Sequence, residues 1–575
     1  MTAALLWAAA LLPGLIAYNV PPSPTLFNQA AAMGLWGLGL ASMAPGCTRD
    51  LRAVVARTGA LQTALALVAA AALLSSTFGV LPWAMSLSAA GLLLATMAMA
   101  LAGAALRPSA ALLIAFFAAW VAAGLVNGVI ALLQVFAPDL ADSDWVARSG
   151  IAGRAVGNMR QPNHLATLLL WSAVALVPLV EMGPLGRTWV RRAAALALMA
   201  LTVFGVTLSG SRTGLVGIAV LALWGGLDRR LSRTSRGLLL AAPLLCAAAW
   251  GLTAWWAAVQ HTHAIGAAAR LGGGDFSASR FAIWRDTLSL IAAQPWLGVG
   301  FGEFNFAWTL TPLPDRPLAF FDHTHNLPLQ LAVELGLPLA ALLLALLAWA
   351  LWLAWQRCRA VAGPMGAALR AAFVMVLLMA LHSQLEYPLW YAHFLLPTAL
   401  AWGLCLGPGG PEAPPSAVLP PTLWPIGAGL AMVMATAMLL ADYHRVVVIF
   451  SPPAAAAPLE ERIAAGQRSW FFPHHADYAA ATTTEQPADA LPAFARASHH
   501  LLDTRLMIAW AQALAQSGRS GDLDRARHLA ARLREFRNPA ADDFFAPCAE
   551  PALATRAAPF QCQAPEHVYG WRDFR

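Results

Sequence analysis

The chain has 575 residues, of which 59% are hydrophobic and only 11% are charged. Soluble globular proteins carry about 25% charged residues, so this composition excludes a large soluble domain and indicates an all-α polytopic membrane protein. The formal net charge of +7 rests entirely on arginine as the basic residue. It does not indicate nucleic-acid binding, because the arginines cluster in short loops between apolar runs.

Apolar runs of membrane-spanning length recur along the first 441 residues. A span needs about 20 apolar residues. Segment 2–18 lacks a basic residue ahead of its apolar run, so we interpret it as a membrane helix rather than a signal peptide. The thirteen predicted spans are 2–18, 26–43, 58–76, 80–103, 109–137, 163–182, 189–208, 213–227, 237–259, 326–355, 370–384, 388–407 and 422–441.

Arginine-rich short loops follow only the even-numbered spans. Residues 49–57 follow the second span and residues 229–236 follow the eighth. Since positive loops stay in the cytoplasm, the N-terminus is predicted to be cytoplasmic and the opposite side to receive the polar loops. That opposite side collects 138–162, 208–213, the large loop at about 260–325, 382–388 and everything after 441.

Residues 442–575 are more polar and predict a separate helical domain on the non-cytoplasmic side, after a membrane domain at 1–441. Residues 501–515 and 522–537 have the pattern of two amphipathic helices, a tetratricopeptide-like pair. If this part faces an oxidising compartment, Cys548 and Cys562 can form a disulfide. The other four cysteines lie in or beside membrane segments and are interpreted as packing residues.

The polar loop 138–162 ends in a cluster of hydrogen-bonding side chains at the entry to the sixth span. An N-cap explains Asn163, but it does not explain the whole cluster, so we favour a binding role. The residues of this cluster are Asn158, Arg160, Gln161, Asn163 and His164.

Two further arginines lie on the non-cytoplasmic side, where the charge rule disfavours them. Arg212 follows Ser211 at a helix start, where it either snorkels to the interface or captures an anion, and we favour the anion. Arg280 and Arg285 lie on a predicted amphipathic helix. Arg285 has Asp286 beside it as an ion-pair partner, so Arg280 is the better candidate for a phosphate.

The segment Asp322–Asn326 opens the tenth predicted span with two histidines, His323 and His325. Zinc sites use three or four ligands, and no cysteine pair lies here, so no metal is predicted. A histidine titrates near neutral pH and suits a general base. We prefer His325 for that role because it directly precedes Asn326.

Glu386 and Tyr387 lie in the loop 382–388, on the same predicted non-cytoplasmic side as His325. Glu386 is either a paired structural carboxylate or a group that orients a histidine or an acceptor, and the sequence leaves both open.

Together these elements resemble the O-antigen ligase and polymerase superfamily (the Wzy_C type). The features that carry the resemblance are the turn 211–212, the helix with Arg280, the turn 295–302, and His325-Asn326 opening a helix followed by Gly336. Residues 157–167 and 386–392, with a polar C-terminal region, are similar to the PglL-type bacterial protein O-oligosaccharyltransferases.

The resemblance implies an inverting, metal-independent glycosyltransferase without cofactor, in the bacterial inner membrane with its active site on the periplasmic face. The donor would be an oligosaccharide on undecaprenyl diphosphate, and the acceptor a Ser or Thr of a periplasmic protein such as pilin. His325 would be the base, and Arg212 and Arg280 would bind the diphosphate. Supporting or acceptor-side roles fall to Asn158, Arg160, Gln161, Asn163, His164, Arg285, His323, Asn326, Glu386 and Tyr387.

Two other functions remain open at this point. An O-antigen ligase to lipid A-core, or an O-antigen polymerase, would share the same arginines and histidine and differ only in the acceptor. A transporter of the lipid-linked glycan would instead line a path with charged groups inside the spans. The sequence crowds its polar groups on one face, which favours an enzyme.

Overall fold

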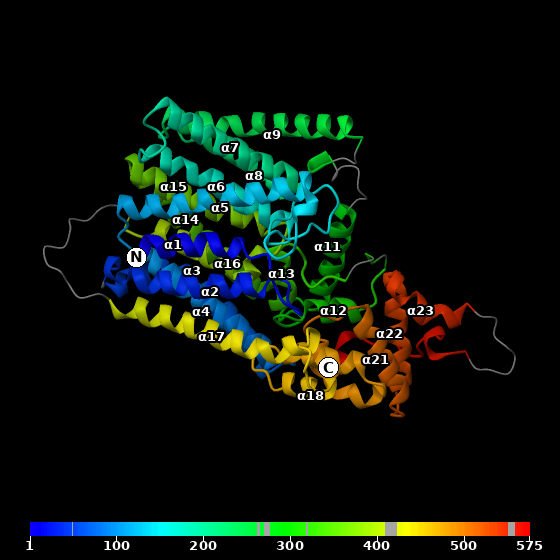
Figure 1. The fold of residues 1–575 in the computed structure, drawn as a ribbon. Helices are drawn as coiled ribbons and strands as arrows, with labels where there is room; N and C mark the ends of the chain where they lie inside the picture. The colour runs from blue at the N-terminus through cyan, green and yellow to red at the C-terminus, as the bar shows by residue number, and fades with distance from the viewer. Residues whose placement is uncertain are drawn as a thin grey trace.

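The computed structural model describes the chain except residues 49, 262–264, 269–275, 315, 318–319, 409–421 and 550–557. Within the described residues the fold is all-helical, and the one extended pairing is an isolated bridge between Cys47 and Leu106. Long apolar helices lie side by side in one bundle, and shorter helices gather at one of its ends (Figure 1). The predicted all-α fold is therefore confirmed for the described residues.

Nine of the described helices have the length and composition to cross a membrane, so a multi-pass membrane protein is supported. The other four predicted spans fall on helices that are shorter or less apolar, and the number thirteen stays a prediction. The nine are α3 (Leu51–Thr77), α4 (Trp83–Ala105), α5 (Ala110–Phe136), α6 (Pro162–Glu181), α7 (Trp189–Ser209), α9 (Arg233–Val259), α14 (Leu337–Ala360), α15 (Gly363–His382) and α17 (Leu423–Phe450). The other four are α1 (Thr2–Leu11), α2 (Leu26–Met43), α8 (Arg212–Leu227) and α16 (Ala392–Leu406).

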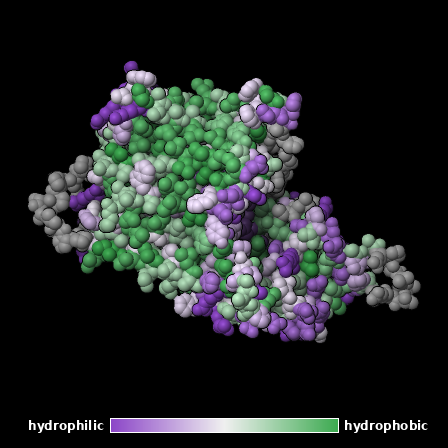
Figure 2. All heavy atoms as spheres, viewed as in Figure 1, coloured by the Kyte–Doolittle hydropathy of each residue, from purple (hydrophilic) through white to green (hydrophobic). Residues whose placement is uncertain are grey.

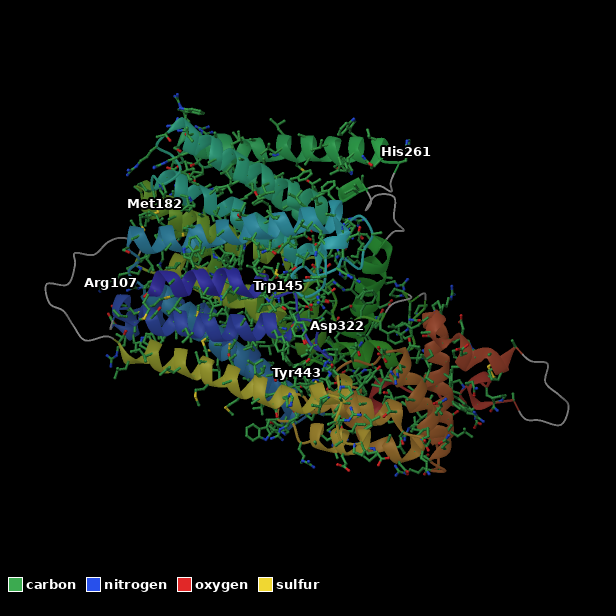
Figure 3. The ribbon with its side chains drawn as sticks, viewed as in Figure 1. Arg107, Trp145, Met182, His261, Asp322 and Tyr443 are labelled. Carbon is green, nitrogen blue, oxygen red and sulfur yellow. A yellow bond between two sulfur atoms is a disulfide. The ribbon has the colours of Figure 1, made fainter. Side chains whose placement is uncertain are left out.

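The labelled residues mark the two ends of the bundle. Arg107 and Met182 lie at one end, whereas Trp145, His261 and Asp322 lie at the other, which we call the site end (Figure 3). Apolar side chains cover the middle of the bundle, and hydrophilic ones gather at its ends and over the C-terminal helices (Figure 2). This is the arrangement that the predicted topology requires. Which end faces the cytoplasm stays a prediction.

The predicted continuous helix over 326–355 is wrong, because the chain breaks at Gly336 into α13 (Leu327–Leu335) and α14. Gly336 has φ +79°, and a Cβ there would lie 2.2 Å from the carbonyl oxygen of Trp296. The turn 295–302 fits into this break. The backbone N–H of Val299 donates to the carbonyl of Val333 at 2.8 Å, which satisfies a free carbonyl at the end of α13.

Gly336→Ala is expected to destabilise the chain by about 3 kcal/mol or more, because it combines a strained backbone with a steric overlap. The apparent melting temperature of the purified protein in detergent measures this. Gly91→Ala is the matched control, since Gly91 lies inside α4 and a methyl group added there would meet no atom within 4 Å. That variant should melt at the same temperature as wild type or higher. Equal melting of both variants would contradict the packing of this turn.

The C-terminal helices share an apolar core with the segment that precedes α14. In α12 (Phe304–Leu310), Phe306 and Trp308 are buried, and Trp308 contacts the ring of Phe536 at a centroid distance of 5.5 Å. The C-terminal helices are α18 (Leu459–Gly466), α19 (Pro473–Thr483), α20 (Leu491–Ala497), α21 (Thr504–Gln516), α22 (Asp522–Phe536) and α23 (Asp542–Phe545).

The helices predicted at 501–515 and 522–537 are present as α21 and α22, and they pack against each other. Cys548 and Cys562 form a disulfide, which the sequence had left open, while the other four cysteines are free. The division of the chain at residue 441 stays a prediction.

Candidate active site

The carboxylate of Glu386 joins three segments that are far apart in the sequence. It pairs with the guanidinium of Arg280 on α11 (Phe276–Ala293). It also accepts a hydrogen bond from Nδ2 of Asn163 at 2.8 Å, and its Oε2 lies 2.7 Å from Nδ1 of His325. Glu386 itself lies in the turn between α15 and α16, so four elements meet at one buried carboxylate at the site end of the bundle.

Glu386 carries a negative charge at neutral pH. Burial raises the pKa of this carboxyl, but the hydrogen bond and charge of His325, together with Arg280, lower it further, and the net pKa lies below its ordinary value. Of the two interpretations left open by the sequence, the geometry matches a carboxylate that orients a histidine. The same contacts also make it a structural pair with Arg280.

His325 is held in the orientation that a general base needs. An ionised carboxylate only accepts hydrogen bonds, so Nδ1 of His325 is the donor to Glu386, and in the neutral tautomer with this donor Nε2 carries the lone pair. No hydrogen bond to Nε2 occurs among the described residues, and the side chain keeps 15% of its surface exposed. The next residue, Asn326, caps α13 by accepting from the N–H of Leu329 at 3.0 Å. This cap fixes the backbone on which His325 stands, at φ +55°.

A second hydrogen-bonded path leads from Glu386 to Arg212. Oδ1 of Asn163 accepts from the hydroxyl of Ser211 at 2.6 Å, and that hydroxyl in turn caps α8 by accepting from Gly214 at 3.0 Å. Arg212 follows at the first position of α8, exposed and without an ion pair among the described residues. An arginine beside the free N–H groups of a helix start is suited to binding an anion.

The interpretation of Asn163 as a helix cap is wrong. Gln161 is the N-cap of α6, and its Oε1 accepts from the N–H of His164 at 2.7 Å. Pro162 occupies the first helical position, where its missing N–H costs nothing. The amide of Asn163 is therefore free to bridge Glu386 and Ser211.

His323 belongs to a different pair from His325. Its Nδ1 lies 3.0 Å from Oδ1 of Asp322, and its ring stacks on Tyr387 with centroids 4.2 Å apart. Tyr387 also meets His325 edge-on at 5.2 Å. The ring of Tyr387 thus contacts both histidines. His323 lies against the carboxylate of Asp322, and His325 lies against that of Glu386.

Several residues predicted to support the site hold the surrounding loop instead of touching Glu386. Asn158 is buried and donates to the carbonyls of Leu15 and Trp145 at 2.7 and 2.8 Å. Arg160 donates to the carbonyl of Ala17 at 2.7 Å. These contacts fasten loop 138–162 onto the segment after α1.

Arg285 also lies outside the Glu386 cluster. Its guanidinium pairs with the buried Asp286 at 3.0 Å and donates to the carbonyl of Pro314 at 2.7 Å. The ion pair that the sequence offered as the simpler interpretation of Arg285 is therefore present.

His164 is buried beneath the site, where its ring packs edge-on against Tyr391 at 4.5 Å. His382 lies beside it and shares a hydrogen bond of 2.8 Å with the hydroxyl of Thr167. Sequence reasoning did not single out Ser211, His382 or Tyr391 as site residues. Ser211 had a usable signal, since it precedes a helix on the same predicted side of the membrane as the other polar groups.

An apolar cavity of about 750 Å³ adjoins the polar cluster. Leu327, Gln384 and Trp390 line its edge, next in sequence to or near Asn326 and Glu386. From there it runs between α3, α4, α14 and α17, where its walls are mostly aliphatic. The site therefore combines the ionised carboxylate of Glu386, the imidazole of His325, the exposed guanidinium of Arg212 and an apolar groove.

Three family models match separate parts of the chain. The model described as O-antigen ligase covers residues 196–344, which include Arg212, Arg280 and His325. The model described as virulence factor membrane-bound polymerase, C-terminal, covers 370–543 and includes Glu386. A short model described as protein glycosylation ligase covers 155–179 and includes Asn163. The residues joined at Glu386 thus fall in all three matched segments.

The chain is also similar to a general O-oligosaccharyltransferase of Acinetobacter baylyi (strain ATCC 33305 / BD413 / ADP1), with 27% identity over 303 residues. The matched region covers 51% of this chain and 50% of that relative, so it spans about half the length of the curated protein. The resemblance drawn from the sequence is confirmed by these matches.

Proposed function

We propose that this chain transfers an oligosaccharide en bloc from undecaprenyl diphosphate to Ser or Thr hydroxyls of periplasmic proteins such as pilin. The transfer takes place at the periplasmic face of the bacterial inner membrane. One observation carries the proposal: hydrogen bonds through Asn163 connect the His325–Glu386 pair to Ser211, the residue before the exposed Arg212, and an apolar groove is lined by residues near Asn326 and Glu386 in the sequence. The similarity to an O-oligosaccharyltransferase supports the reaction class.

The reaction uses His325 as its base. The acceptor hydroxyl attacks the anomeric carbon of the first sugar, and Nε2 of His325 takes the hydroxyl proton. The bond between that carbon and the diphosphate oxygen breaks, which releases undecaprenyl diphosphate. Glu386 stabilises the imidazolium that forms. Attack opposite the leaving group inverts the anomeric centre.

The departing diphosphate needs positive charge, which arginine supplies in this proposal without a metal ion. Arg212 faces solvent at the start of α8, so its full charge is available to a phosphate. Arg280 is partly neutralised by Glu386 and binds with its remaining N–H groups. Stabilising the charge that develops on a leaving group is a major source of rate enhancement in enzymes.

The groove suits the polyprenyl tail of the donor. Each methylene group that leaves water contributes about 0.8 kcal/mol, so an apolar channel beside the phosphate site gives affinity for a long isoprenoid. Leu327 and Trp390 line this groove and lie near Asn326 and Glu386 in the sequence, which supports a tail bound next to the diphosphate.

Arg212→Ala is expected to raise the donor KM by about 10- to 100-fold, as a hydrogen bond to a charged group contributes about 1.5–3 kcal/mol. Melting temperature should not change, because Arg212 has no protein partner among the described residues. Initial rates against donor concentration, at saturating acceptor, measure the change. Arg519→Ala removes the same charge from an exposed turn before α22 and should leave the donor KM as in wild type. An unchanged KM in Arg212→Ala would remove this residue from the donor site.

Mass spectrometry of periplasmic glycopeptides, in cells with and without this chain, tests the proposed function. Glycan-bearing Ser or Thr peptides should disappear without the chain. The match to the O-antigen ligase model favours, as the second candidate, transfer to lipid A-core. That candidate predicts unchanged glycopeptides and a loss of glycan from lipopolysaccharide.

A further inference from the structure

Three histidines gather among the C-terminal helices, away from Glu386. His474 and His475 lie in the first turn of α19, and His500 lies in the turn before α21. One ring nitrogen from each lies within 4.8 Å of the other two. The ring centroids of His474 and His500 are 4.1 Å apart. Two separate segments of the chain thus bring three imidazoles to one point.

The ring nitrogens of this histidine cluster have no hydrogen-bond partner among the described residues. Nδ1 of His474 is buried and bonded to nothing in that part of the chain. Native proteins rarely leave a buried polar atom unbonded, so each such atom calls for a ligand or another explanation. Ring stacking explains the packing of the three side chains, but it leaves the buried Nδ1 of His474 unbonded, whereas His475 is half-buried and His500 is exposed.

An imidazole binds a metal ion through the lone pair of a ring nitrogen. Three like cations in contact would repel one another, whereas three neutral rings each offer a lone pair. Neutral imidazole is the form that ligates transition metals.

We propose that His474, His475 and His500 bind one divalent transition-metal ion, Zn²⁺ foremost, with water completing a tetrahedral set. Zinc binds imidazole nitrogen at about 2.0–2.1 Å, which places ligand nitrogens about 3.3 Å apart. The three side chains therefore need to close by up to about 1.5 Å, a shift that χ rotation supplies. The donor set is all nitrogen, which suits zinc, copper or nickel and disfavours calcium or magnesium.

The position of the cluster indicates what the ion does. Phe472, just before α19, packs against Tyr443 on α17 with centroids 5.0 Å apart. Next to His500, Nδ1 of His499 lies 2.8 Å from Oε2 of Glu303, the residue before α12. The cluster therefore lies between the end of a bundle helix and the segment that leads to the loop with His325. An ion there ties the C-terminal helices to the rim of the active site and takes no part in the transfer chemistry.

Metal binding by the full chain in detergent tests this proposal. The protein carries an affinity tag without histidine, is stripped with a chelator and dialysed against Zn²⁺, and its bound metal is measured by elemental mass spectrometry. Wild type should hold about one Zn²⁺ per chain, and His475→Gln and His500→Gln less than about a tenth of that. His444→Gln is the control, since His444 is exposed on α17 outside the cluster, and it should bind as wild type does. Wild type without bound zinc, or cluster variants that bind as wild type does, would overturn the site.

Melting temperature provides a second readout that does not depend on activity. Added Zn²⁺ should raise the melting temperature of stripped wild type and of His444→Gln, because a ligand that binds only the folded state stabilises it. The two cluster variants should show no shift. If either cluster variant fails to fold, the other carries the test, since the two residues lie in separate segments. An equal zinc-induced shift in all proteins would contradict the proposal.

Discussion

His325→Ala should reduce glycan transfer by about 10²- to 10⁴-fold, the usual contribution of a positioned general base. Nε2 of His325 is the atom that receives the acceptor proton, and Glu386 can orient only a ring that is present. Alanine at φ +55° also adds backbone strain, so a second variant is needed. Asparagine tolerates this left-handed conformation, and His325→Asn removes the base with less effect on the backbone.

Initial rates with lipid-linked glycan and a purified acceptor protein measure both variants. Both should lose activity to a similar extent while eluting and melting as folded protein. His444→Gln, a change of an exposed histidine far along the chain, should transfer glycan at the wild-type rate. A rate for His325→Asn close to that of wild type would remove His325 as the base.

Glu386→Gln should lower kcat by about 10²-fold or more, because the carboxylate holds the tautomer and the orientation of His325. A glutamine amide can rotate to donate to Nδ1, which would move the imidazole proton to Nε2 and block the base. The change also leaves Arg280 without its ionic partner, and breaking a buried pair costs about 3–5 kcal/mol. Activity and stability are therefore both expected to fall.

A matched pair elsewhere in the chain separates these two effects. Oε2 of Glu303 lies 2.8 Å from Nδ1 of His499, both side chains are buried, and neither contacts the Glu386 cluster. Glu303→Gln should therefore lower the melting temperature while the folded protein keeps its kcat. If Glu386→Gln and Glu303→Gln lower stability equally and both keep kcat, Glu386 is a structural carboxylate only.

Much of the fold followed from the length of apolar runs. Runs of about 20 apolar residues predicted α5 and α6 within a few residues, because the bilayer fixes the length of a span. The break at Gly336 was missed, since apolar residues continue on both sides of it. Only the turn at 295–302, which lies well before it in the chain, requires a glycine there. Pro338 in the first turn of α14 was the local signal.

The site was predicted in part. His325, Arg212 and Arg280 were selected by their residue type and by their predicted side of the membrane. Ionisable groups at the ends of apolar helices usually pair with another group or have a function. The role of Glu386 could not be decided from the sequence. Its partners Asn163 and Arg280 lie 223 and 106 residues away, and a carboxylate's role depends on which groups it contacts. Asn163 is a second example. Gln161 caps α6 in its place, and the role of Asn163 is set by Glu386 and Ser211, which lie far from it in the sequence.

The most direct test of the proposed function is glycan transfer by the purified chain in detergent. The donor is an oligosaccharide on undecaprenyl diphosphate, and a Ser- and Thr-containing periplasmic protein and lipid A-core are offered together as acceptors. Peptide mass spectrometry should locate the intact oligosaccharide on Ser or Thr of the protein, and His325→Asn should abolish that product. Glycan found on lipid A-core alone, or equal protein glycosylation by His325→Asn, would contradict the proposed function.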